Sequence, residues 1–512
     1  MLSKINSMAL QGLDGYLIDV QVDVSNGMPC FEMVGLPDTS VKEAKERVKT
    51  AIKNSGYELL SKRIVVNLAP ADTKKEGSIF DLPIAIGILQ DIGEISNKDL
   101  SKIAFIGELS LDGKINRVNG ILPMCIEARK LGIEELIVPS ANANEAAIVE
   151  EMKVIGVKNL RQVVGYLNGE INLNTSKVDL EELFNSENKY TLDFSEVKGQ
   201  ENIKRALEIA AAGRTQCATY SEVRAHGKTM MARRIPSILP DLSFEEALEI
   251  TKIHSVAGEL PKSIPIITTR PFRSPHHTVS GTSLVGGGRI PRPGEISLAH
   301  FGVLFLDELP EFNKNTLEVM RGPLEDGVVT ISRVNATLTY PCNFMFVASM
   351  NPCPCGYYGS KDKECNCTPQ MISKYMGKVS GPLLDRIDIQ VEVTPVKYNK
   401  LDGEEVAESS KEIKKRVDMA RKIQQQRYAK EKIYSNSQLT PKLIEKYCKL
   451  DEESRNILKL SFEKLGLSAR AHGRILKVAR TIADLANEEN IKKEHIAEAI
   501  QYRNLDKKYW KN

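Results

Sequence analysis

The amino-acid sequence predicts a chain of several α/β domains that ends in a helical region. Residues 1–168 and 193–395 each alternate short apolar, strand-like runs with helical segments, which is typical of α/β domains. Residues 396–512 are mostly charged amphipathic helix. A polar stretch at 169–192 separates the first two regions, and we expect it to be a linker. A length of 512 residues suits such a multidomain arrangement.

Composition and charge narrow the class of protein. Hydrophobic residues make up 42% of the chain and charged residues 27%, as in ordinary globular proteins. The sequence has no run of about eighteen apolar residues and no signal-peptide pattern, so we expect no membrane span. Nine cysteines in a chain of this length do not indicate a disulfide scaffold, and their scatter is typical of a cytoplasmic protein. The net charge of +3 neither implies nor excludes a nucleic-acid partner.

The first region reads as an α/β domain from its individual segments. YLIDVQVDV (16–24) alternates apolar and polar residues with the period of a strand. VKEAKERVKTAIKNSG (41–56) has helical spacing and ends at a glycine, and DLPIAIGILQDIG (81–93) reads as an apolar helix. RIVVNLAP (63–70) and ELIVPS (135–140) continue the pattern as short strands.

The second region contains a strand that runs straight into two acidic residues. In GVLFLDELPEF (302–312), four apolar residues precede Asp307 and Glu308. A buried parallel strand with this ending places carboxylates at the carboxyl edge of the sheet, where ligands bind. One acid could hold Mg²⁺ and the next could polarise an attacking water. The alternative is a strand with surface acids at its end.

A second strand candidate ends in an amide. NFMFVASMNP (343–352) is apolar up to Asn351, whose side chain could position a water beside a γ-phosphate. Taken alone, Asn351 could simply cap the strand. Because this segment follows 302–312 in the chain, we favour the catalytic interpretation.

Only half of a phosphate-binding loop is present upstream. Gly227, Lys228 and Thr229 begin a helical segment, and in such loops the lysine reaches the β/γ-phosphates while the threonine hydroxyl binds Mg²⁺. The full pattern also needs a glycine five residues before Gly227, where this chain has Glu222. The preceding QCATYSEV (216–223) is a poor buried strand.

The order of these motifs resembles that of the magnesium-chelatase-like AAA+ ATPases of the ComM and YifB family. The resemblance covers nearly the whole chain, and motifs of such length in this order are highly specific. It rests on FEMVGLPDTSVKEAKERV, NLAPADTKKEGSIFDLPIAIG, VKGQENIKRALEIAAAG, RPFRSPHHTVS, GGGRIPRPGEISLAHFGVLFLDELPEF, NPCPCGYYG, GPLLDRIDIQVEV and LSARAHGRILKVARTIADL. It implies a P-loop AAA+ core at 193–395, a helical C-terminal lid, ATP and Mg²⁺ as ligands, and a homo-oligomeric ring, expected to be a hexamer.

The resemblance also assigns roles to particular residues. Lys228 and Thr229 are similar to the Walker A pair, and Asp307 and Glu308 to the Walker B pair. The remaining assignments are Asn351 as sensor 1, Arg386 as the arginine finger, Arg470 as the sensor 2 arginine, and Val197, Gly199 and Gln200 beside the adenine. Two fixed guanidinium groups would stabilise charge on the transferring phosphoryl group. Alternatively, Arg386 pairs with Asp385 or Asp388, and Arg470 is a surface residue.

Two explanations fit the departure of residues 214–226 from the family pattern, which reads approximately GHNVLLIGSPGAGKT. One is genuine divergence of the loop. The other is a shift of reading frame: one permitted codon string for residues 214–229 becomes that family sequence when three single bases are removed. We favour the second explanation because it restores the apolar strand and the glycine loop together.

The first region resembles the Lon-protease-like (ribosomal-protein-S5-like) fold. Peptide hydrolysis by that fold needs a Ser–Lys dyad. When the chain is aligned with that fold, Phe80 falls at the position of the nucleophile and Leu122 at the position of the lysine. Ser78 has no lysine partner that we can assign, and we expect Lys74 and Lys75 to be solvated. We therefore expect a non-proteolytic domain used for binding or assembly.

The segment CPCGYYGSKDKECNC (353–367) holds four cysteines as two C-x-C pairs. Four thiolates on one loop could close a tetrahedral, structural Zn²⁺ site, although C-x-C is tighter than the usual spacing. Free thiols or a disulfide within the loop are the alternatives. The four candidate ligands are Cys353, Cys355, Cys365 and Cys367.

A basic, glycine-rich insertion lies between the Walker motifs, in RPFRSPHHT (270–278) and GGGRIPRPG (286–294). Arg273, Arg289 and Arg292 could contact a DNA backbone at a central pore, or could serve subunit contacts instead. The adjacent histidines in the first segment read as polar loop residues.

The sequence therefore favours an ATP-driven ring motor that acts on single-stranded or branched DNA, similar to ComM-type helicases of natural transformation and recombination. Two alternatives stay open. One is a chelatase-type ATPase that remodels a protein partner. The other is a non-hydrolysing scaffold, which would follow if the altered loop is genuine.

Overall fold

The computed structural model describes residues 2–59, 62–96, 99–185, 190–221, 228–288, 291–333, 336–359, 363–393, 407–431, 433–465 and 469–503. The chain forms two compact units: unit 1 is residues 1–186 with 247–268, and unit 2 is residues 187–246 with 269–512. Segment 247–268, which lies inside the range expected for the second domain, thus clusters with unit 1. None of the helices in the described ranges is long and apolar enough to cross a membrane.

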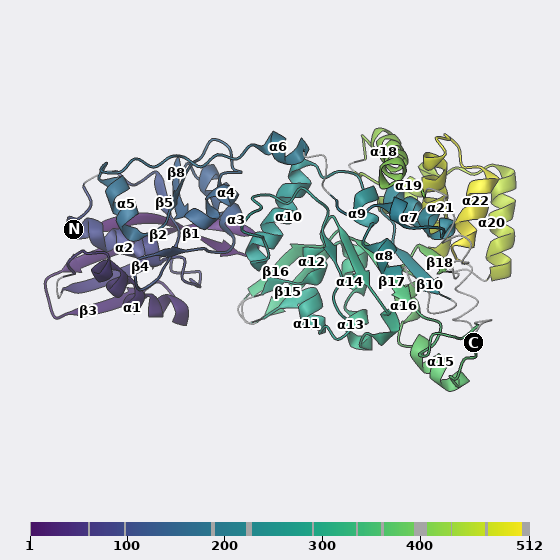
Figure 1. Ribbon diagram of the computed structural model, residues 1–512, viewed down its shortest axis with the longest axis horizontal. Helices are drawn as coiled ribbons and strands as arrows, with labels where there is room; N and C mark the ends of the chain where they lie inside the picture. The colour runs from purple at the N-terminus through teal and green to yellow at the C-terminus, as the bar shows by residue number, and fades with distance from the viewer. Residues whose placement is uncertain are drawn as a thin grey trace. The chain divides into compact units, whose positions relative to one another are not determined.

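Unit 1 is built on a mixed seven-stranded sheet with the order β3-β4-β2-β1-β5-β8-β9 (Figure 1). Strand β2 pairs antiparallel with β1 and β4, and the remaining pairings are parallel. The period-two pattern of β2 buries Ile18, Val20 and Val22, as the sequence predicts. The strands of this sheet are β1 (Ser3–Gln11), β2 (Asp14–Ser25), β3 (Cys30–Val34), β4 (Arg63–Ala69), β5 (Ile103–Phe105), β8 (Glu135–Pro139) and β9 (Lys153–Val157). A separate antiparallel hairpin joins β6 (Glu108–Leu109) and β7 (Ile115–Asn116).

The helices of unit 1 follow their apolar patterns. In the first helix Asp38 is the N-cap, and its side chain accepts a hydrogen bond from the Val41 amide. Every residue from Asp81 to Leu89 is buried, which explains why the second helix is apolar all round. The helices are α1 (Thr39–Asn54), α2 (Asp81–Asp91), α3 (Ile121–Lys130), α4 (Ala143–Ala146), α5 (Leu160–Leu167) and α6 (Leu180–Asn185).

Unit 2 contains a five-stranded, wholly parallel sheet with the order β11-β14-β17-β10-β18. The central strands β14 and β17 are buried along their whole length. The segment that read as a poor buried strand does form β10, because two neighbouring strands supply its backbone partners. The bounds are β10 (Cys217–Ser221), β11 (Phe272–Arg273), β14 (Val303–Leu306), β17 (Met345–Met350) and β18 (Ile389–Val393), with the hairpins β12 (Gly286–Gly287)–β13 (Arg292–Pro293) and β15 (Val328–Arg333)–β16 (Ala336–Pro341).

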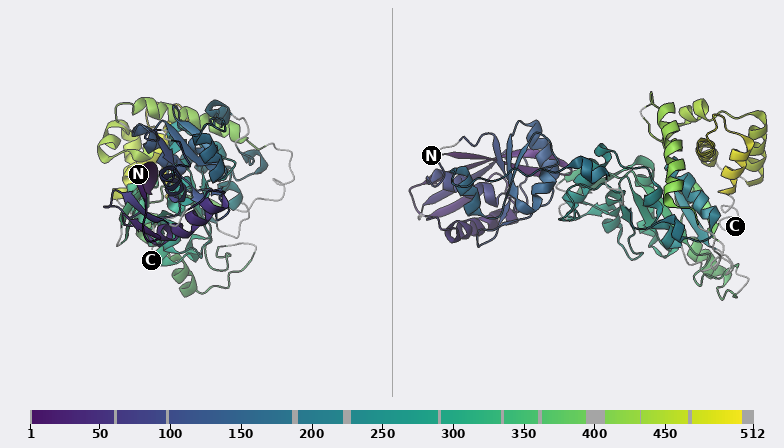
Figure 2. Two further views of the ribbon diagram at one scale, coloured as in Figure 1. Left: turned by 90° about the vertical axis from the view of Figure 1, so that its left-hand side faces the viewer. Right: turned by 45° about the horizontal axis from the view of Figure 1, so that its top comes forward.

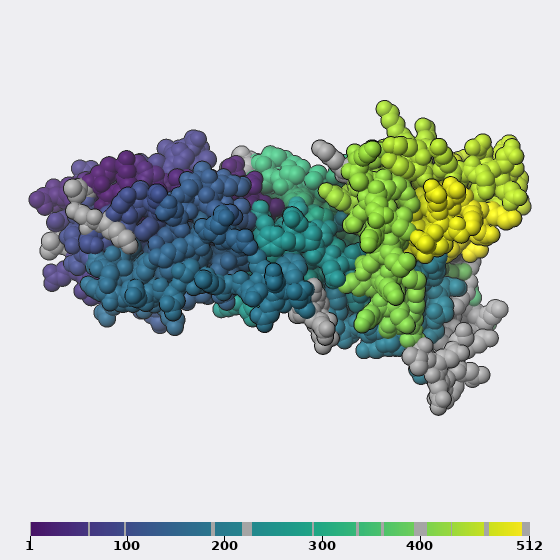
Figure 3. Space-filling model, turned by 90° about the horizontal axis from the view of Figure 1, so that it is seen from above, coloured from purple at the N-terminus to yellow at the C-terminus, as the bar shows by residue number. Residues whose placement is uncertain are grey.

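The C-terminal helices share one apolar core with the strands and helices of the parallel sheet. This core joins Ile209, Phe305, Val417 and Ile482. Figure 2 shows the C-terminal helices gathered together, and Figure 3 shows the first of them lying across the surface of unit 2. The C-terminal helices are α18 (Ser410–Arg427), α19 (Pro441–Tyr447), α20 (Glu452–Leu465), α21 (Ala469–Leu485) and α22 (Lys493–Gln501). The described part of 396–512 is therefore helical, as predicted.

Shorter helices flank the strands of unit 2. The helix α10 begins in unit 2, and its residues from Ala247 cluster with unit 1 as part of 247–268. The bounds are α7 (Glu201–Gly213), α8 (Lys228–Ala232), α9 (Ile235–Ile238), α10 (Phe244–Ala257), α11 (Gly281–Val285), α12 (Glu295–Leu298), α13 (Lys314–Glu318), α14 (Arg321–Asp326), α15 (Pro369–Met376) and α16 (Gly381–Leu384).

Arg214, the residue that ends α7, occupies a position suited to glycine. Its φ of 57° is in the left-handed region, which costs free energy for a side chain other than glycine. Its guanidinium stacks over Phe301, 4.9 Å from the ring centre, and donates to the Asn343 carbonyl. Burial, together with the nearby charges of Arg270 and Arg421, lowers the pKa of Arg214 to about 9. A buried arginine beside two others is unfavourable, and glycine is the residue that the frame-shift explanation restores here.

We expect Arg214→Gly to stabilise unit 2, by about 1 kcal/mol or more, because it removes backbone strain and a buried charge. Thermal unfolding of the two proteins would measure the change. Arg214→Ala is the matched control, since it removes the charge but keeps the left-handed strain, and should recover only part of the gain. A lower melting temperature for Arg214→Gly would contradict the idea that this position is built for glycine.

Candidate functional site

The candidate site lies at the carboxyl ends of β14 and β17, beside the start of α8. Asp307 directly follows β14, Asn351 directly follows β17, and Lys228 and Thr229 open α8. Because neighbouring parallel strands end at the same edge of a sheet, all four side chains converge there. The structure therefore brings together these four of the residues that the sequence singled out.

Lys228 bridges the start of α8 to the end of β17. Its Nζ donates to Asn351 Oδ1 at 2.9 Å and to the Met350 carbonyl at 3.3 Å. Burial lowers the pKa of Lys228, while the nearby charges of Asp307 and Glu308 raise it. The ammonium group is thus held at the position from which a phosphate could draw it away.

Thr229 and Asp307 form an oxygen pair that suits a magnesium ion. Thr229 Oγ1 donates to Asp307 Oδ2 at 2.7 Å. The other carboxylate oxygen, Oδ1, accepts from the Glu308 amide at 3.0 Å and from the Ser349 hydroxyl. Mg²⁺ prefers oxygen ligands and usually keeps several waters, so a hydroxyl and a carboxylate side by side fit this ion.

Glu308 has a strained backbone with a φ of 53°, and Leu309–Glu311 follows it as a short turn. Its amide donates to Asp307 Oδ1 and lies 3.3 Å from Ser349 Oγ. Left-handed backbone at a residue other than glycine is typical of functional sites, where surrounding contacts hold it. The half-buried carboxylate is suited to polarising a water at this edge.

Ser349 was not singled out from the sequence. It is fully buried on β17, and it contacts both Asp307 and the Glu308 amide. Its one sequence signal is a hydroxyl inside an otherwise apolar strand. Whether that hydroxyl meets a functional residue depends on the register between β14 and β17, which the sequence does not reveal.

The three residues expected beside the adenine lie just before α7. Val197 is buried, while Gly199 and Gln200 have positive φ values of 70° and 63°. Two consecutive left-handed residues turn the backbone sharply into the helix. Gly227, with the rest of 222–227, lies outside the described residues.

Arg386 and Arg470 lie away from the Lys228 side chain. Both line a cavity of about 1530 Å³, and its lining includes none of the described residues at the ends of β14 and β17. Arg386 is buried, donates to the Pro382 carbonyl at 2.7 Å and pairs with Glu325 at 2.5 Å. It therefore pairs with neither of the neighbouring aspartates considered above. Arg470 is exposed at the start of α21.

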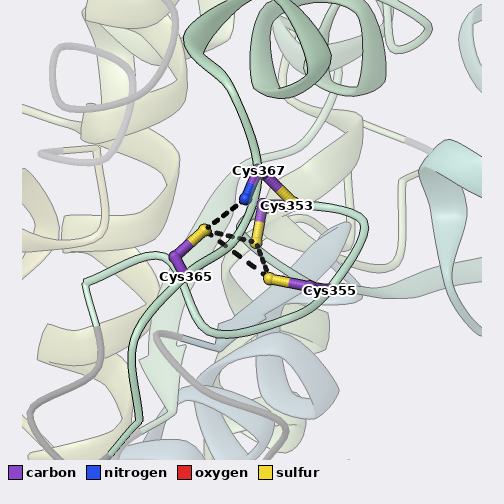
Figure 4. Close-up of side chains that lie close together, drawn as sticks. All are labelled: Cys353, Cys355, Cys365 and Cys367. Carbon is purple, nitrogen blue, oxygen red and sulfur yellow. Dashed lines mark hydrogen bonds between the residues drawn. The ribbon is translucent and has the colours of Figure 1, made fainter.

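The four cysteines of 353–367 converge (Figure 4). Their sulfur atoms all lie within 4.8 Å of one another. The sulfur of Cys353 is 3.3 Å from that of Cys355 and 3.7 Å from that of Cys365, and the Cys355–Cys365 distance is 3.5 Å. A tetrahedral Zn²⁺ with bonds of about 2.3 Å has sulfur–sulfur edges of about 3.8 Å, so the cluster fits this ion. All four are free thiols, without a disulfide.

Electrostatics at this cluster also suit a metal. Burial raises the pKa of Cys355, but the Tyr357 amide and the neighbouring thiols outweigh burial and lower it to about 6. Backbone amides lower the pKa of Cys365 and of Cys367, but burial and the neighbouring thiols outweigh them and raise both, so the cluster favours one thiolate over several before a metal binds.

The three arginines proposed for DNA contact differ in their surroundings. Arg273 on β11 pairs with Glu295 through two contacts of 2.6 and 2.7 Å, which neutralise its charge locally. Arg292 is exposed on β13. Arg289 lies outside the described residues.

In unit 1 the expectation that Lys75 is solvated is wrong. Its side chain is fully buried, and Nζ donates to the Thr73 carbonyl at 2.7 Å. Local sequence suggested exposure because KKEG is polar, but the loop packs against residues near position 36. The Ser78 hydroxyl donates to the Glu108 carboxylate, not to a lysine.

Comparisons with known proteins cover almost the whole chain. Residues 193–401 match the family model described as magnesium chelatase, subunit ChlI, residues 407–503 match its C-terminal region, and residues 20–142 match the model of subunit ChlI of Mg-chelatase. The magnesium-chelatase 38 kDa subunit of Rhodobacter capsulatus is 24% identical over 223 residues, which are 40% of this chain and 59% of that protein.

Two relatives align over almost their full length. Competence protein ComM of Haemophilus influenzae is 43% identical over 505 residues, which are 98% of this chain and 97% of the relative. Protein YifB of Escherichia coli is 42% identical over 510 residues, 99% of this chain and 98% of the relative. The chain therefore belongs to the magnesium-chelatase-like family of ComM and YifB.

Proposed function

We propose that the protein is an ATP-driven AAA+ ring motor that acts on DNA. The observation that carries this proposal is the convergence of Lys228, Thr229, Asp307 and Asn351 at one sheet edge. These residue types are the ones that phosphoryl transfer needs: a cation for the phosphates, oxygen ligands for Mg²⁺ and an amide for the water. Mg²⁺ at Thr229 and Asp307 would supply neutralisation of the phosphate charge.

The protein residues divide the remaining work. Lys228 would exchange its contact with Asn351 for the β/γ-phosphates, which frees the amide to hold a water. Glu308 would then orient that water for in-line attack. Val197, Gly199 and Gln200 would bound the adenine.

The two arginines support a ring assembly. Because Arg386 and Arg470 line a cavity apart from Lys228, they would complete the site of a neighbouring subunit rather than their own. Arg386 would leave Glu325 for the γ-phosphate of that neighbour. An arrangement in which each subunit completes the next site closes into a ring, for which we favour a hexamer.

DNA is the proposed substrate of the motor, by analogy with the relative named competence protein ComM. Exposed Arg292 and the nearby Arg289 would contact the phosphate backbone at the pore. Arg273, which Glu295 neutralises, would chiefly hold the insertion in place. Single-stranded or branched DNA in recombination and natural transformation is the expected context, and the cytoplasm the expected location.

Unit 1 would serve binding or assembly as a Lon-protease-like domain without peptidase activity. The pairing of Ser78 with Glu108 and of Lys75 with Thr73 leaves the serine without a basic partner among these residues. The four-cysteine loop would hold a structural Zn²⁺, because all four sulfur atoms fit one tetrahedral ion.

Two other functions make different predictions. A chelatase-type motor, favoured by similarity to magnesium-chelatase subunits over part of the chain, would hydrolyse ATP without a response to DNA. A non-hydrolysing scaffold, which would follow from a genuine loop at 214–226, would not hydrolyse ATP at all. Resequencing of the encoding locus decides whether that loop is genuine.

We expect the chain to gain DNA-stimulated ATP hydrolysis when GHNVLLIGSPGA replaces residues 214–226. In this loop-restored protein, Glu308→Gln should lower kcat about 100-fold with ATP binding retained, because it removes the base that orients water. Turnover is measured by phosphate release with and without single-stranded DNA. Asp112→Asn, an exposed change in unit 1, is the control. Hydrolysis that ignores DNA would instead favour the chelatase-type motor.

For DNA binding, Arg292→Ala should weaken affinity and reduce the slope of log affinity against log salt by about one, because one phosphate contact is lost. Fluorescence anisotropy with labelled single-stranded DNA at several salt concentrations gives that slope. Arg129→Ala serves as the comparison, since that exposed arginine pairs with Glu151 in unit 1. Equal slopes for Arg292→Ala and the parent would remove Arg292 from the DNA contact.

A further inference from the structure

The four-cysteine loop is attached to the catalytic edge at its first end. Cys353 comes two residues after Asn351, and Asn351, Pro352 and Cys353 are all buried. The amide of Gly356 donates to the Cys353 carbonyl at 3.0 Å, and Gly356 has a φ of 81°. This glycine turn brings Cys355 back beside Cys353.

The second end of the loop leads directly into α15. Cys367 precedes Thr368, whose hydroxyl caps the helix by accepting from the Met371 amide at 3.3 Å. The cysteine cluster therefore brings the two ends of the loop, which follow β17 and precede α15, close together. Thiols are weak hydrogen-bonding groups, so this closure is weak until a metal binds all four.

Helix α15 returns to the same edge through Tyr375. This side chain is buried, and burial raises its pKa above the ordinary value; Glu311, Glu308 and Cys353 raise it further, while the backbone amide of Asn351 lowers it. The Asn351 amide hydrogen-bonds to the Tyr375 hydroxyl, and α15 packs against the turn Leu309–Glu311 that follows Glu308. Just beyond α15, Lys378 Nζ lies 3.9 Å from Glu311 Oε2.

Asn351 is consequently held from two directions. Its side chain accepts from Lys228, which belongs to α8, and its main chain lies between the cysteine loop and Tyr375. The residues that would bind the phosphates and Mg²⁺, Lys228 and Thr229, lie on α8 and do not depend on α15. A disturbance of the loop should therefore move Asn351 without removing the phosphate ligands.

We propose that a metal bound by the four cysteines clamps Asn351 and Tyr375 at the catalytic edge, so that metal occupancy controls the rate of ATP hydrolysis and not the affinity for ATP. Tyr375 is a positioning residue in this arrangement. The regulatory part of the proposal rests on the proposed ATPase function, whereas the mechanical clamp does not.

Hydrogen exchange tests the clamp without any need for ATP turnover. Backbone amides in 345–353 should exchange about tenfold more slowly in protein loaded with ZnCl₂ than in protein stripped by a chelator. The double change Cys365→Ser with Cys367→Ser should abolish this difference. Cys30→Ser is the matched control because it alters a half-buried cysteine in unit 1, and it should preserve the difference. Equal exchange in loaded and stripped protein would overturn the proposal.

A second variant covers the case in which metal-free protein unfolds. Tyr375→Phe should retain zinc at the parent stoichiometry, yet speed exchange at 345–353 several-fold. In the loop-restored chain it should lower kcat about tenfold with the KM for ATP within about twofold. Parent-like exchange and kcat in this variant would sink the clamp. If the loop-restored parent itself hydrolyses no ATP, the ATPase proposal fails, and the exchange data still judge the clamp.

Discussion

The parallel register between β14 and β17 is the constraint on which the candidate site depends. Leu306 pairs with Ala348, so the next residues along the two strands, Asp307 and Ser349, are neighbours. The same register leaves Asn351 at the end of β17, where Lys228 reaches it. Both strands are fully buried. A slip of one residue would turn the polar side chains of one strand to the opposite face of the sheet, so that Ser349 would no longer meet Asp307.

Charge balance explains how this edge tolerates a half-buried lysine. Lys228 loses hydration on burial, and the carboxylates of Asp307 and Glu308 offset part of that cost. Its hydrogen bonds to Asn351 and the Met350 carbonyl satisfy further donors. Each of these contacts can be exchanged for a phosphate oxygen, so the site is organised in advance for a ligand with the opposite charge.

The residues of the proposed site lie in two places. One group of residues lies at the carboxyl ends of β14 and β17. A second group, which includes Arg386 and Arg470, lines the large cavity that is also lined by the C-terminal helices. Glu325 neutralises the charge of the Arg386 guanidinium locally until a stronger anion replaces that carboxylate. In the proposed ring, a neighbouring subunit would supply the second group.

Local sequence alone determined which polar residues follow directly after the buried strands. Asp307, Glu308 and Asn351 could be identified because short apolar runs end at them, and the helical C-terminal region and the period of β2 could be predicted from spacing in the same way. Tertiary structure decided the partners. Three contacts join segments that are separated along the chain: Ser349 with Asp307, Tyr375 with Asn351, and Arg273 with Glu295. In the same way, a distant segment of the chain buries Lys75. Periodicity specifies which face of an element is apolar, but strand order and register specify what that face meets, and these arise from packing of the whole unit.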